Sequence, residues 1–189
     1  SVIMPAYNVE KYIGDAIRSV INQTYKDWEL VVVVDPSKDR TLQVAKSFKD
    51  KRIRIIENKK RTNIPTSRNI GLKVSSGKFI SFLDADDMFV PNKLELQVRF
   101  IKKERVDMVY ADFFIINLKG KIIGKMKMDE FKKELLFRKF LIPTGSVMVK
   151  RKVFKRVGFF DERLELAEDV DLWMRIAEAG FRIKKMNFY

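Results

Sequence analysis

The sequence of 189 residues contains no cysteine and no histidine. Without cysteine the chain forms no disulfide, no thiolate zinc site and no thiolate nucleophile, and without histidine it lacks the side chain that most often acts as a general base. Acid–base chemistry therefore falls to aspartate and glutamate. No uninterrupted apolar run approaches the roughly 18 residues of a membrane span, and the opening SVIMP lacks the basic start of a signal peptide. These absences predict a cytoplasmic protein.

The composition is that of one folded domain with a basic surface. Hydrophobic residues make up 46% of the chain and aromatic residues 12%, which suffices for the core of a single domain over residues 1–189. The formal charge of +14 suits nucleic acid, anionic lipid or a phosphorylated small substrate as partner. The basic clusters are spread along the chain, at 49–52, 59–61, 150–152 and 184–185. This spread favours a solvated surface over a duplex-binding groove, so we expect no nucleic-acid partner.

The first half of the chain alternates strand and helix patterns. Strands are expected at 1–5, 28–35, 52–57 and 78–84, and helices after a cap at Asn8, over 37–48, from Pro65 and from Pro91. This repeated unit predicts an α/β fold with a mostly parallel, twisted sheet and helices on both faces. Such sheets bind ligands at the carboxyl ends of their strands, where Asp35 and Asp84 are expected.

The pattern changes after residue 105. We expect a hairpin over 107–126, an amphipathic helix over 129–140, a strand over 145–150, a short helix, a helix over 168–179 closed by Gly180, and a strand-like end. No repeat or linker separates the halves, so a nucleotide-binding part at about 1–105 and an acceptor-side part at about 106–189 form one domain. Because the final stretch FRIKKMNFY is strand-like, we expect the protein to continue beyond Tyr189.

The stretch FLDADD places three aspartates, Asp84, Asp86 and Asp87, within four positions at the end of an apolar strand. Like charges this close raise one another's pKa and cost folding energy. A cation removes that cost, and oxygen-only ligands suit a hard divalent ion such as Mg²⁺ or Mn²⁺. The cluster therefore predicts a site for a divalent metal.

Six motifs occur in an order and spacing that together resemble a family 2 glycosyltransferase, inverting and of the GT-A fold. They are SVIMPAYN, SVINQTYKDWELVVVVD, SRNIGL, GKFISFLDADD, GFFDERL and EDVDLWMRIAEAG. The resemblance spans nearly the whole chain. It implies transfer of a sugar from a nucleoside diphosphate sugar, with a UDP-sugar expected, to an acceptor hydroxyl on a glycan or a lipid-linked acceptor. It also implies inversion at the anomeric carbon and a divalent metal, Mn²⁺ or Mg²⁺, on the diphosphate.

The resemblance assigns nucleotide-binding residues to the first half. It implies that Asp35 binds the base and that Pro5 and Tyr7 border it, with the Tyr7 ring as a stacking platform. For Asp35, a turn or cap aspartate in DPSKD is the alternative. By the same resemblance Arg68 in SRNIGL approaches the nucleotide or its diphosphate, and a structural ion pair near a helix start is an equal alternative.

The resemblance also divides the tasks within FLDADD. It implies that Asp86 binds the metal that bridges the diphosphate, while Asp84 lies toward the ribose or the metal shell. Asp87 either assists the metal or caps the helix that follows Pro91. A metal on the leaving diphosphate acts as a Lewis acid as the glycosyl bond breaks.

Glu168 and Asp169 open the last expected helix. Carboxylates at a helix N-terminus are stabilised by the helix dipole, by roughly 0.3–1 kcal/mol, which is the purely structural interpretation. The resemblance implies that the aspartate here is the general base, and an inverting displacement needs only one; this is Asp169, with Glu168 beside it in the substrate site. Asp171 is expected to pair with Arg175, and Trp173 to lie in the core or to border the acceptor.

Three alternatives stay open. A sugar-phosphate nucleotidyltransferase of related fold is one, although PAYNVEKY lacks the glycine-rich loop that those enzymes carry, and a basic nucleic-acid-binding module is another. The third concerns the stretch 129–140, whose apolar side either packs on the sheet or rests on anionic lipid at the cytoplasmic face of a membrane. A peripheral membrane contact is therefore a further expectation.

Overall fold

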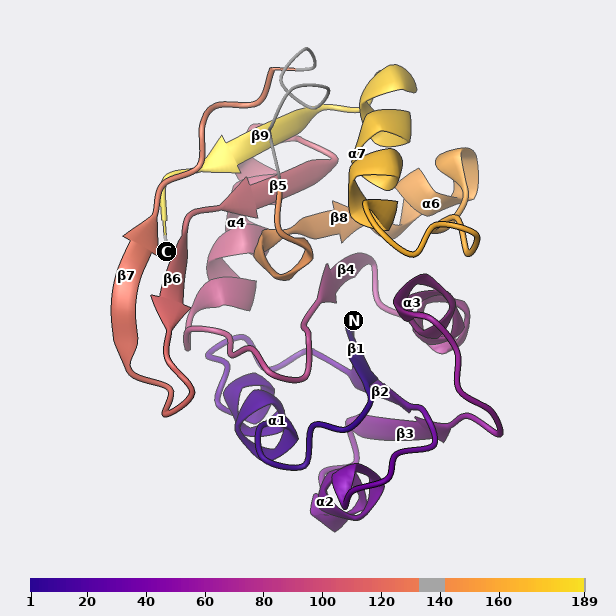
Figure 1. The fold of residues 1–189 in the computed structure, drawn as a ribbon. Coiled ribbons are helices and arrows are strands. Elements are labelled where there is room, and N and C mark those ends of the chain that lie inside the picture. The colour runs from indigo at the N-terminus through magenta and orange to yellow at the C-terminus, as the bar shows by residue number, and fades with distance from the viewer. Residues whose placement is uncertain (133–141, 189) are drawn as a thin grey trace.

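The computed structural model describes residues 1–132 and 142–188 (Figure 1). The strands are β1 (Val2–Ala6), β2 (Leu30–Val34), β3 (Ile53–Glu57), β4 (Phe79–Phe82), β5 (Met108–Ala111), β6 (Phe113–Ile116), β7 (Ile122–Met126), β8 (Met148–Lys150) and β9 (Ile183–Met186). The helices are α1 (Ile13–Ile21), α2 (Thr41–Ser47), α3 (Ile64–Val74), α4 (Lys93–Glu104), the 3₁₀ turn η1 (Thr144–Ser146), α6 (Arg151–Val157) and α7 (Glu168–Glu178).

Seven strands form one sheet in the order β3-β2-β1-β4-β8-β5-β9. All neighbouring pairs are parallel except those of β8, which runs antiparallel to β4 and to β5. Every residue of β2 is buried, because both faces of the sheet are covered. The prediction of an α/β fold with a mostly parallel sheet is confirmed. The division into a nucleotide-binding and an acceptor-side part stays a prediction.

The two faces of the sheet form two separate cores. Met4 on one face packs in a cluster with Ile13 and Ile17 of α1, whereas its neighbour Ile3 packs on the other face with Leu72 of α3. This alternation follows from the two-residue period of a strand, which sends successive side chains to opposite faces. Helices therefore cover both faces, as the sequence predicts.

Several expected boundaries are wrong. The strand expected over 145–150 is confined to Met148–Lys150, because residues 144–146 form η1, and the helix expected from Pro91 begins at Lys93. Helix α1 begins at Ile13, and Asn8 adopts a left-handed conformation with φ of 51° instead of capping it. The Asn8 side chain accepts a hydrogen bond from the backbone N–H of Lys38, so it joins the loop after β1 to the loop after β2. The helix expected over 37–48 is shorter, at Thr41–Ser47, because the preceding residues form that loop contact.

The hairpin expected over 107–126 is divided into two sheets. Strand β5 belongs to the large sheet, and the hairpin proper is β6–β7, a separate two-stranded sheet. The break falls at Asp112, which is buried, accepts a hydrogen bond from the backbone N–H of Met128 and pairs with Lys185. In Figure 1 the hairpin lies along the flank of the molecule beside β5 and β9, on the opposite side from β3.

The amphipathic helix expected over 129–140 lies mostly outside the described residues. Within its described part, Phe131 packs against the cluster that contains Tyr110 and Trp173. Within residues 1–132 and 142–188, no helix is both long and apolar enough to cross a membrane.

Lys93 in α4 is a buried lysine, and its burial leads to a prediction about how stability depends on pH. Its ammonium donates to Gln97 Oε1 at 2.7 Å and to the carbonyl oxygen of Val147 at 3.4 Å, and it lies 4.2 Å from the centre of the Phe89 ring. Burial lowers the pKa of Lys93 from 10.5 to about 7. Between these two values the unfolded chain binds a proton that the folded chain releases, so this group makes the free energy of unfolding rise with pH.

We expect Lys93→Met to remove that rise between about pH 7 and pH 10, because methionine fills similar space without a charge to desolvate. Urea denaturation across this pH range measures the slope for wild type and variant. The matched control is Lys102→Met, since Lys102 is exposed on the same helix. Equal slopes for Lys93→Met and wild type would contradict the prediction.

Candidate functional site

The expected site lies at one edge of the sheet. Strands β1, β2 and β4 are parallel, so the residues that follow them meet at the same edge. Tyr7 directly follows β1, and Asp35 directly follows β2. Asp84 lies two positions after the end of β4. Pro5 lies within β1, opposite Val33 of β2. The topology therefore brings together the strand-end residues that the sequence singled out.

Asp35 is buried, and donors from the loop after β3 surround its carboxylate. Asn58 Nδ2 donates to Oδ1 at 2.6 Å, and the backbone N–H of Thr62 donates to Oδ2 at 2.9 Å. The hydroxyl groups of Thr62 and Ser67 contact the same carboxylate at 3.1 and 3.5 Å. A nucleobase that binds Asp35 must share these acceptor positions. Asn58 and Thr62 were not predictable from the sequence, because their polar loop carries no periodic signal.

Tyr7 is half-buried and has a cationic neighbour. The guanidinium carbon of Arg61 lies 4.3 Å from the centre of the Tyr7 ring, within the range of a cation–π contact. Arg61 is itself exposed. The loop that holds Asp35 therefore also places an exposed positive charge next to the aromatic face expected to stack on the base.

Arg68 on α3 connects two acidic residues that are far apart in the sequence. One terminal nitrogen, Nη1, donates to Glu168 Oε1 at 2.6 Å, and the other, Nη2, donates to Asp84 Oδ1 at 2.9 Å. The Arg68 side chain is 4% exposed, and its guanidinium lies 5.5 Å from the centre of the Phe160 ring. Among the described residues, the structural ion pair is therefore what Arg68 forms, and contact with a nucleotide stays a prediction.

Glu168 and Asp169 begin α7 after Ala167, which has a left-handed φ of 60°. Asp169 is half-buried. Its Oδ1 accepts a hydrogen bond from the backbone N–H of Val170 at 2.8 Å, and its Oδ2 accepts one from the Thr144 hydroxyl at 3.3 Å. Glu168 is paired with Arg68, whereas within residues 1–132 and 142–188 the donors to Asp169 are neutral. The two adjacent carboxylates thus have different surroundings.

Asp86 and Asp87 are exposed on the loop after β4. Packing around its carboxyl group and the charges of Asp84 and Asp86 raise the pKa of Asp87 to about 6. Helix α4 begins only at Lys93, so Asp87 does not cap it. An added Cβ at Gly145 would lie 3.9 Å from Asp87 Oδ2, which places η1 beside this loop.

These contacts close into a ring of neighbours. Asp84 contacts Arg68, Arg68 contacts Glu168, Asp169 contacts Thr144, and the residue after Thr144 lies beside Asp87. In the described ranges no three acidic side chains converge closely enough to hold a metal by themselves. A cation at the exposed Asp86 and Asp87 carboxylates would therefore need further oxygen ligands from a bound molecule.

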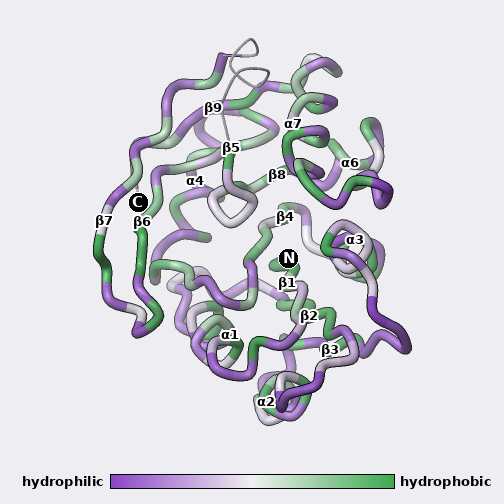
Figure 2. Tube along the Cα trace, in the orientation of Figure 1, coloured by the Kyte–Doolittle hydropathy of each residue, from purple (hydrophilic) through white to green (hydrophobic). Residues whose placement is uncertain are grey.

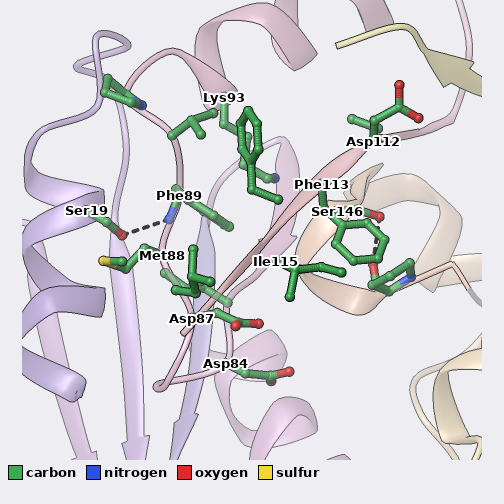
Figure 3. Close-up of a pocket in the computed structure, with 18 of the residues that line it drawn as sticks. Ser19, Asp84, Asp87, Met88, Phe89, Lys93, Asp112, Phe113, Ile115 and Ser146 are labelled. Carbon is green, nitrogen blue, oxygen red and sulfur yellow. Dashed lines mark hydrogen bonds between the residues drawn. The ribbon is translucent and has the colours of Figure 1, made fainter. Parts of the chain in front are cut away.

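A pocket of about 780 Å³ opens beside this ring. Asp84, Asp87 and Met88 line one side of it, and Phe113 and Ile115 of the β6–β7 hairpin line another (Figure 3). The loop at its wall is fixed by the backbone N–H of Phe89, which donates to the Ser19 hydroxyl at 3.1 Å. Such a volume with a largely apolar lining and acidic groups at one end is typical of a site for a sizeable ligand.

Other expectations for α7 are decided by the structure. Asp171 pairs with Arg175 at 2.6 Å, as predicted from their spacing. Trp173 is fully buried and donates its indole N–H to the carbonyl oxygen of Ile142, so of the two alternatives it belongs to the core. The role of the β6–β7 hairpin as a wall of the pocket was not predictable from the sequence, because its apolar residues are those of an ordinary strand.

Comparison with known families gives one match that covers most of the chain. The model for Glycosyl transferase family 2 matches residues 1–159. An uncharacterized glycosyltransferase of Methanocaldococcus jannaschii is 35% identical over 184 residues, covering 93% of this chain and 63% of the relative. The UDP-Glc:alpha-D-GlcNAc-diphosphoundecaprenol beta-1,3-glucosyltransferase WfgD of Escherichia coli is 36% identical over 181 residues, covering 93% of this chain and 68% of the relative. The chain thus spans about two thirds of the length of these relatives.

Two solved structures share the fold. S. aureus TarS 1–349 in complex with UDP has a TM-score of 0.84 at 24% identity, over 100% of this chain and 57% of that one. The mannosyltransferase PcManGT from Pyrobaculum calidifontis, in complex with GDP-Man and Mn²⁺, has a TM-score of 0.76 at 20% identity, over 98% of this chain and 54% of that one. The architecture is the GT-A fold.

Proposed function

The chain belongs to glycosyl transferase family 2, and we propose that it transfers a sugar, with inversion, from a UDP-sugar to a hydroxyl group of a glycan or lipid-linked acceptor. This membership sets aside the nucleotidyltransferase and the nucleic-acid-binding module as alternatives. The names of the relatives support the choice of donor, since WfgD uses UDP-Glc and TarS has been solved with UDP-GlcNAc. The observation that carries the proposal is the Arg68 bridge between Asp84 and Glu168. It holds the loop of the proposed metal ligand and the helix of the proposed general base in one site.

The donor's nucleotide lies at the carboxyl ends of β1 and β2 in this proposal. Asp35 binds the base through its buried carboxylate, and Tyr7 and Pro5 border the base. Arg61 is exposed over the Tyr7 ring, and its positive charge can contact the diphosphate of the donor. This placement agrees with the general rule that parallel sheets bind nucleotides outside the carboxyl ends of their strands.

The residues after β4 fit a divalent cation. Asp86 and Asp87 are exposed carboxylates, and the raised pKa of Asp87 reflects packing and acidic neighbours whose repulsion a cation would relieve. We assign Asp86 as the protein's ligand for Mn²⁺ or Mg²⁺, with Asp84 fixed beside it by Arg68. The cation, when bound, offsets negative charge on the departing diphosphate. PcManGT, a structural neighbour, is known with Mn²⁺.

Asp169 is the proposed general base. Glu168 forms a 2.6 Å ion pair with the buried Arg68, whereas in the part of the chain that the structure describes Asp169 accepts hydrogen bonds from the neutral Val170 N–H and Thr144 hydroxyl. The acceptor hydroxyl gives its proton to the Asp169 carboxylate, and the oxygen lone pair forms the new bond to the anomeric carbon. The bond from that carbon to the diphosphate breaks at the same time, and UDP leaves with the electron pair. The Thr144 hydroxyl orients the base through its hydrogen bond.

The experiment for the metal assignment is Asp86→Ala. We expect the variant to fold normally but to lose the gain in UDP affinity that Mn²⁺ gives to wild type, since the change removes a ligand from a mutually repelling cluster. Isothermal calorimetry with UDP, with and without Mn²⁺, measures this gain. Asp27→Ala is the matched control, because Asp27 is exposed and precedes β2, whereas Asp86 follows the carboxyl end of the parallel strand β4. An unchanged Mn²⁺ effect in Asp86→Ala would refute the assignment.

A further inference from the structure

The β6–β7 hairpin carries an apolar surface that the described part of the chain leaves exposed. Leu118 at its turn is 84% exposed, and Ile122 and Ile123 on β7 are 52% and 64% exposed. Ile115 and Met126 are exposed as well. Figure 2 shows hydrophobic residues along much of this hairpin. Large apolar side chains gathered on one projecting element mark an interaction surface, because a single exposed leucine is ordinary and a contiguous group is not.

The same hairpin is uniformly basic. The stretch from Phe113 to Met128 contains four lysines and no acidic residue. All four lysines are exposed: Lys119, Lys121, Lys125 and Lys127. Lys125 also lies 5.5 Å from the centre of the Phe114 ring. Of the flanking acids, Asp112 is buried and pairs with Lys185, and Asp129 is exposed at the far end from the turn.

The turn of the hairpin touches the loop of the candidate site. Gly120 adopts a φ of 73°, and an added Cβ there would lie 3.3 Å from the methyl group of Met88. Met88 directly follows Asp87. The inner side of the hairpin, with Phe113 and Ile116, lines the pocket beside these residues. Ile115 and Ile122 line the pocket as well, so the exposed surface of the hairpin is continuous with the pocket.

We propose that the β6–β7 hairpin docks the protein on an anionic lipid surface. Leu118 and Ile123 enter the boundary between headgroups and acyl chains, while Lys119 and Lys121 contact lipid phosphates. Charge complementarity favours this occupant over a neutral apolar partner, because a dry contact with such a partner would bury the ammonium groups of Lys119 and Lys121, and residues 113–128 contain no acidic side chain to pair with them. This docking surface differs from the membrane contact considered above for residues 129–140, since it lies on the strands β6 and β7.

Docking also gives the pocket a role. With the hairpin on the lipid surface, the pocket opens beside that surface, where an acceptor carried on a lipid diphosphate can reach Asp84 and Asp169. This route rests on the proposed glycosyl transfer, whereas docking itself does not. The E. coli relative is named for an acceptor of this kind, a diphosphoundecaprenol-linked sugar.

The test is sedimentation of the whole chain with vesicles of phosphatidylcholine and phosphatidylglycerol in equal parts, and with phosphatidylcholine alone. We expect binding to the anionic vesicles that weakens in high salt. Lys119→Gln with Lys121→Gln should weaken it roughly fivefold for each lysine removed. Leu118→Ser with Ile123→Ser should weaken it at both salt concentrations, since the apolar contribution is not screened.

The matched control is Lys49→Gln with Lys51→Gln, which removes the same charge from the turn before β3 and should leave binding unchanged. Equal weakening by the control pair, or no binding of folded wild type at low salt, would overturn the proposal. Sedimentation velocity without lipid tests whether a second copy of the chain covers the hairpin instead. A dimer that Leu118→Ser with Ile123→Ser converts to monomer would also overturn the proposal. No sugar nucleotide is present, so failure here leaves the proposed transfer reaction untouched.

Discussion

Replacing Asp169 with asparagine is expected to lower kcat by about 10²- to 10⁴-fold while leaving the affinity for UDP and Mn²⁺ unchanged. The amide has the size of the carboxylate; its oxygen can accept from the Val170 N–H, and its NH₂ group can donate to the Thr144 hydroxyl oxygen. It cannot accept the proton of the acceptor hydroxyl, and removal of a general base costs about this factor. The loss should therefore appear in the chemical step alone.

The measurement is UDP release from UDP-glucose with undecaprenyl-diphosphate-linked N-acetylglucosamine, the substrate pair named for the E. coli relative, alongside calorimetry with UDP. The matched control is Asp171→Asn on the same helix, whose carboxylate pairs with Arg175 and should affect turnover little. Turnover near that of wild type in Asp169→Asn would refute the assignment. If Glu168→Gln alone abolished turnover, the base would be Glu168.

The second large effect is expected on stability, from Arg68→Met. This change leaves Glu168, whose side chain is 12% exposed, without its cation and removes the partner of the more exposed Asp84. Breaking one side of a buried ion pair typically costs 3–5 kcal/mol, and the exposure of Asp84 reduces its share. The Arg68 Nε is buried without a partner among the described residues, which offsets a further part. We expect the free energy of unfolding to fall by about 3 kcal/mol.

Urea denaturation measures this change. Adding Glu168→Gln to Arg68→Met should recover part of the loss, because the uncompensated carboxylate is then neutral. Arg163→Met is the matched control, since Arg163 also pairs with an aspartate, Asp161, but is 88% exposed. A loss no larger than that of the control would show that the bridge contributes little to folding.

The family and the fold class were predictable from the sequence because their signals are local. The run LVVVV of β2 is buried on both faces, and the apolar residues of α1 repeat with the helical period, so each predicts its own environment. The i,i+4 pair of Asp171 and Arg175 is local in the same sense. Asp84, Asp86 and Asp87 are neighbours in the chain, so their mutual repulsion was also visible before the fold was known.

The tertiary structure alone decided which of these residues meet. Arg68 reaches Asp84 across 16 positions and Glu168 across 100, and Thr144 reaches Asp169 across 25. No periodicity connects such residues, because their distances depend on the order of the strands in the sheet, in which β8 lies between β4 and β5. The two interpretations of Arg68 were therefore equal from the sequence. The structure shows the ion pairs of Arg68 with Asp84 and Glu168, and its contact with a nucleotide stays a prediction.

The hairpin shows the same division. Its β-branched and aromatic residues predicted strands, and strands are what form, because β propensity and the turn at Gly120 are local. That β6 leaves the large sheet follows from the buried Asp112 and its contacts with Met128 and Lys185, which lie far along the chain. The exposure of Leu118 and Ile123 follows from that departure, since a strand retained in the large sheet would have been covered on both faces.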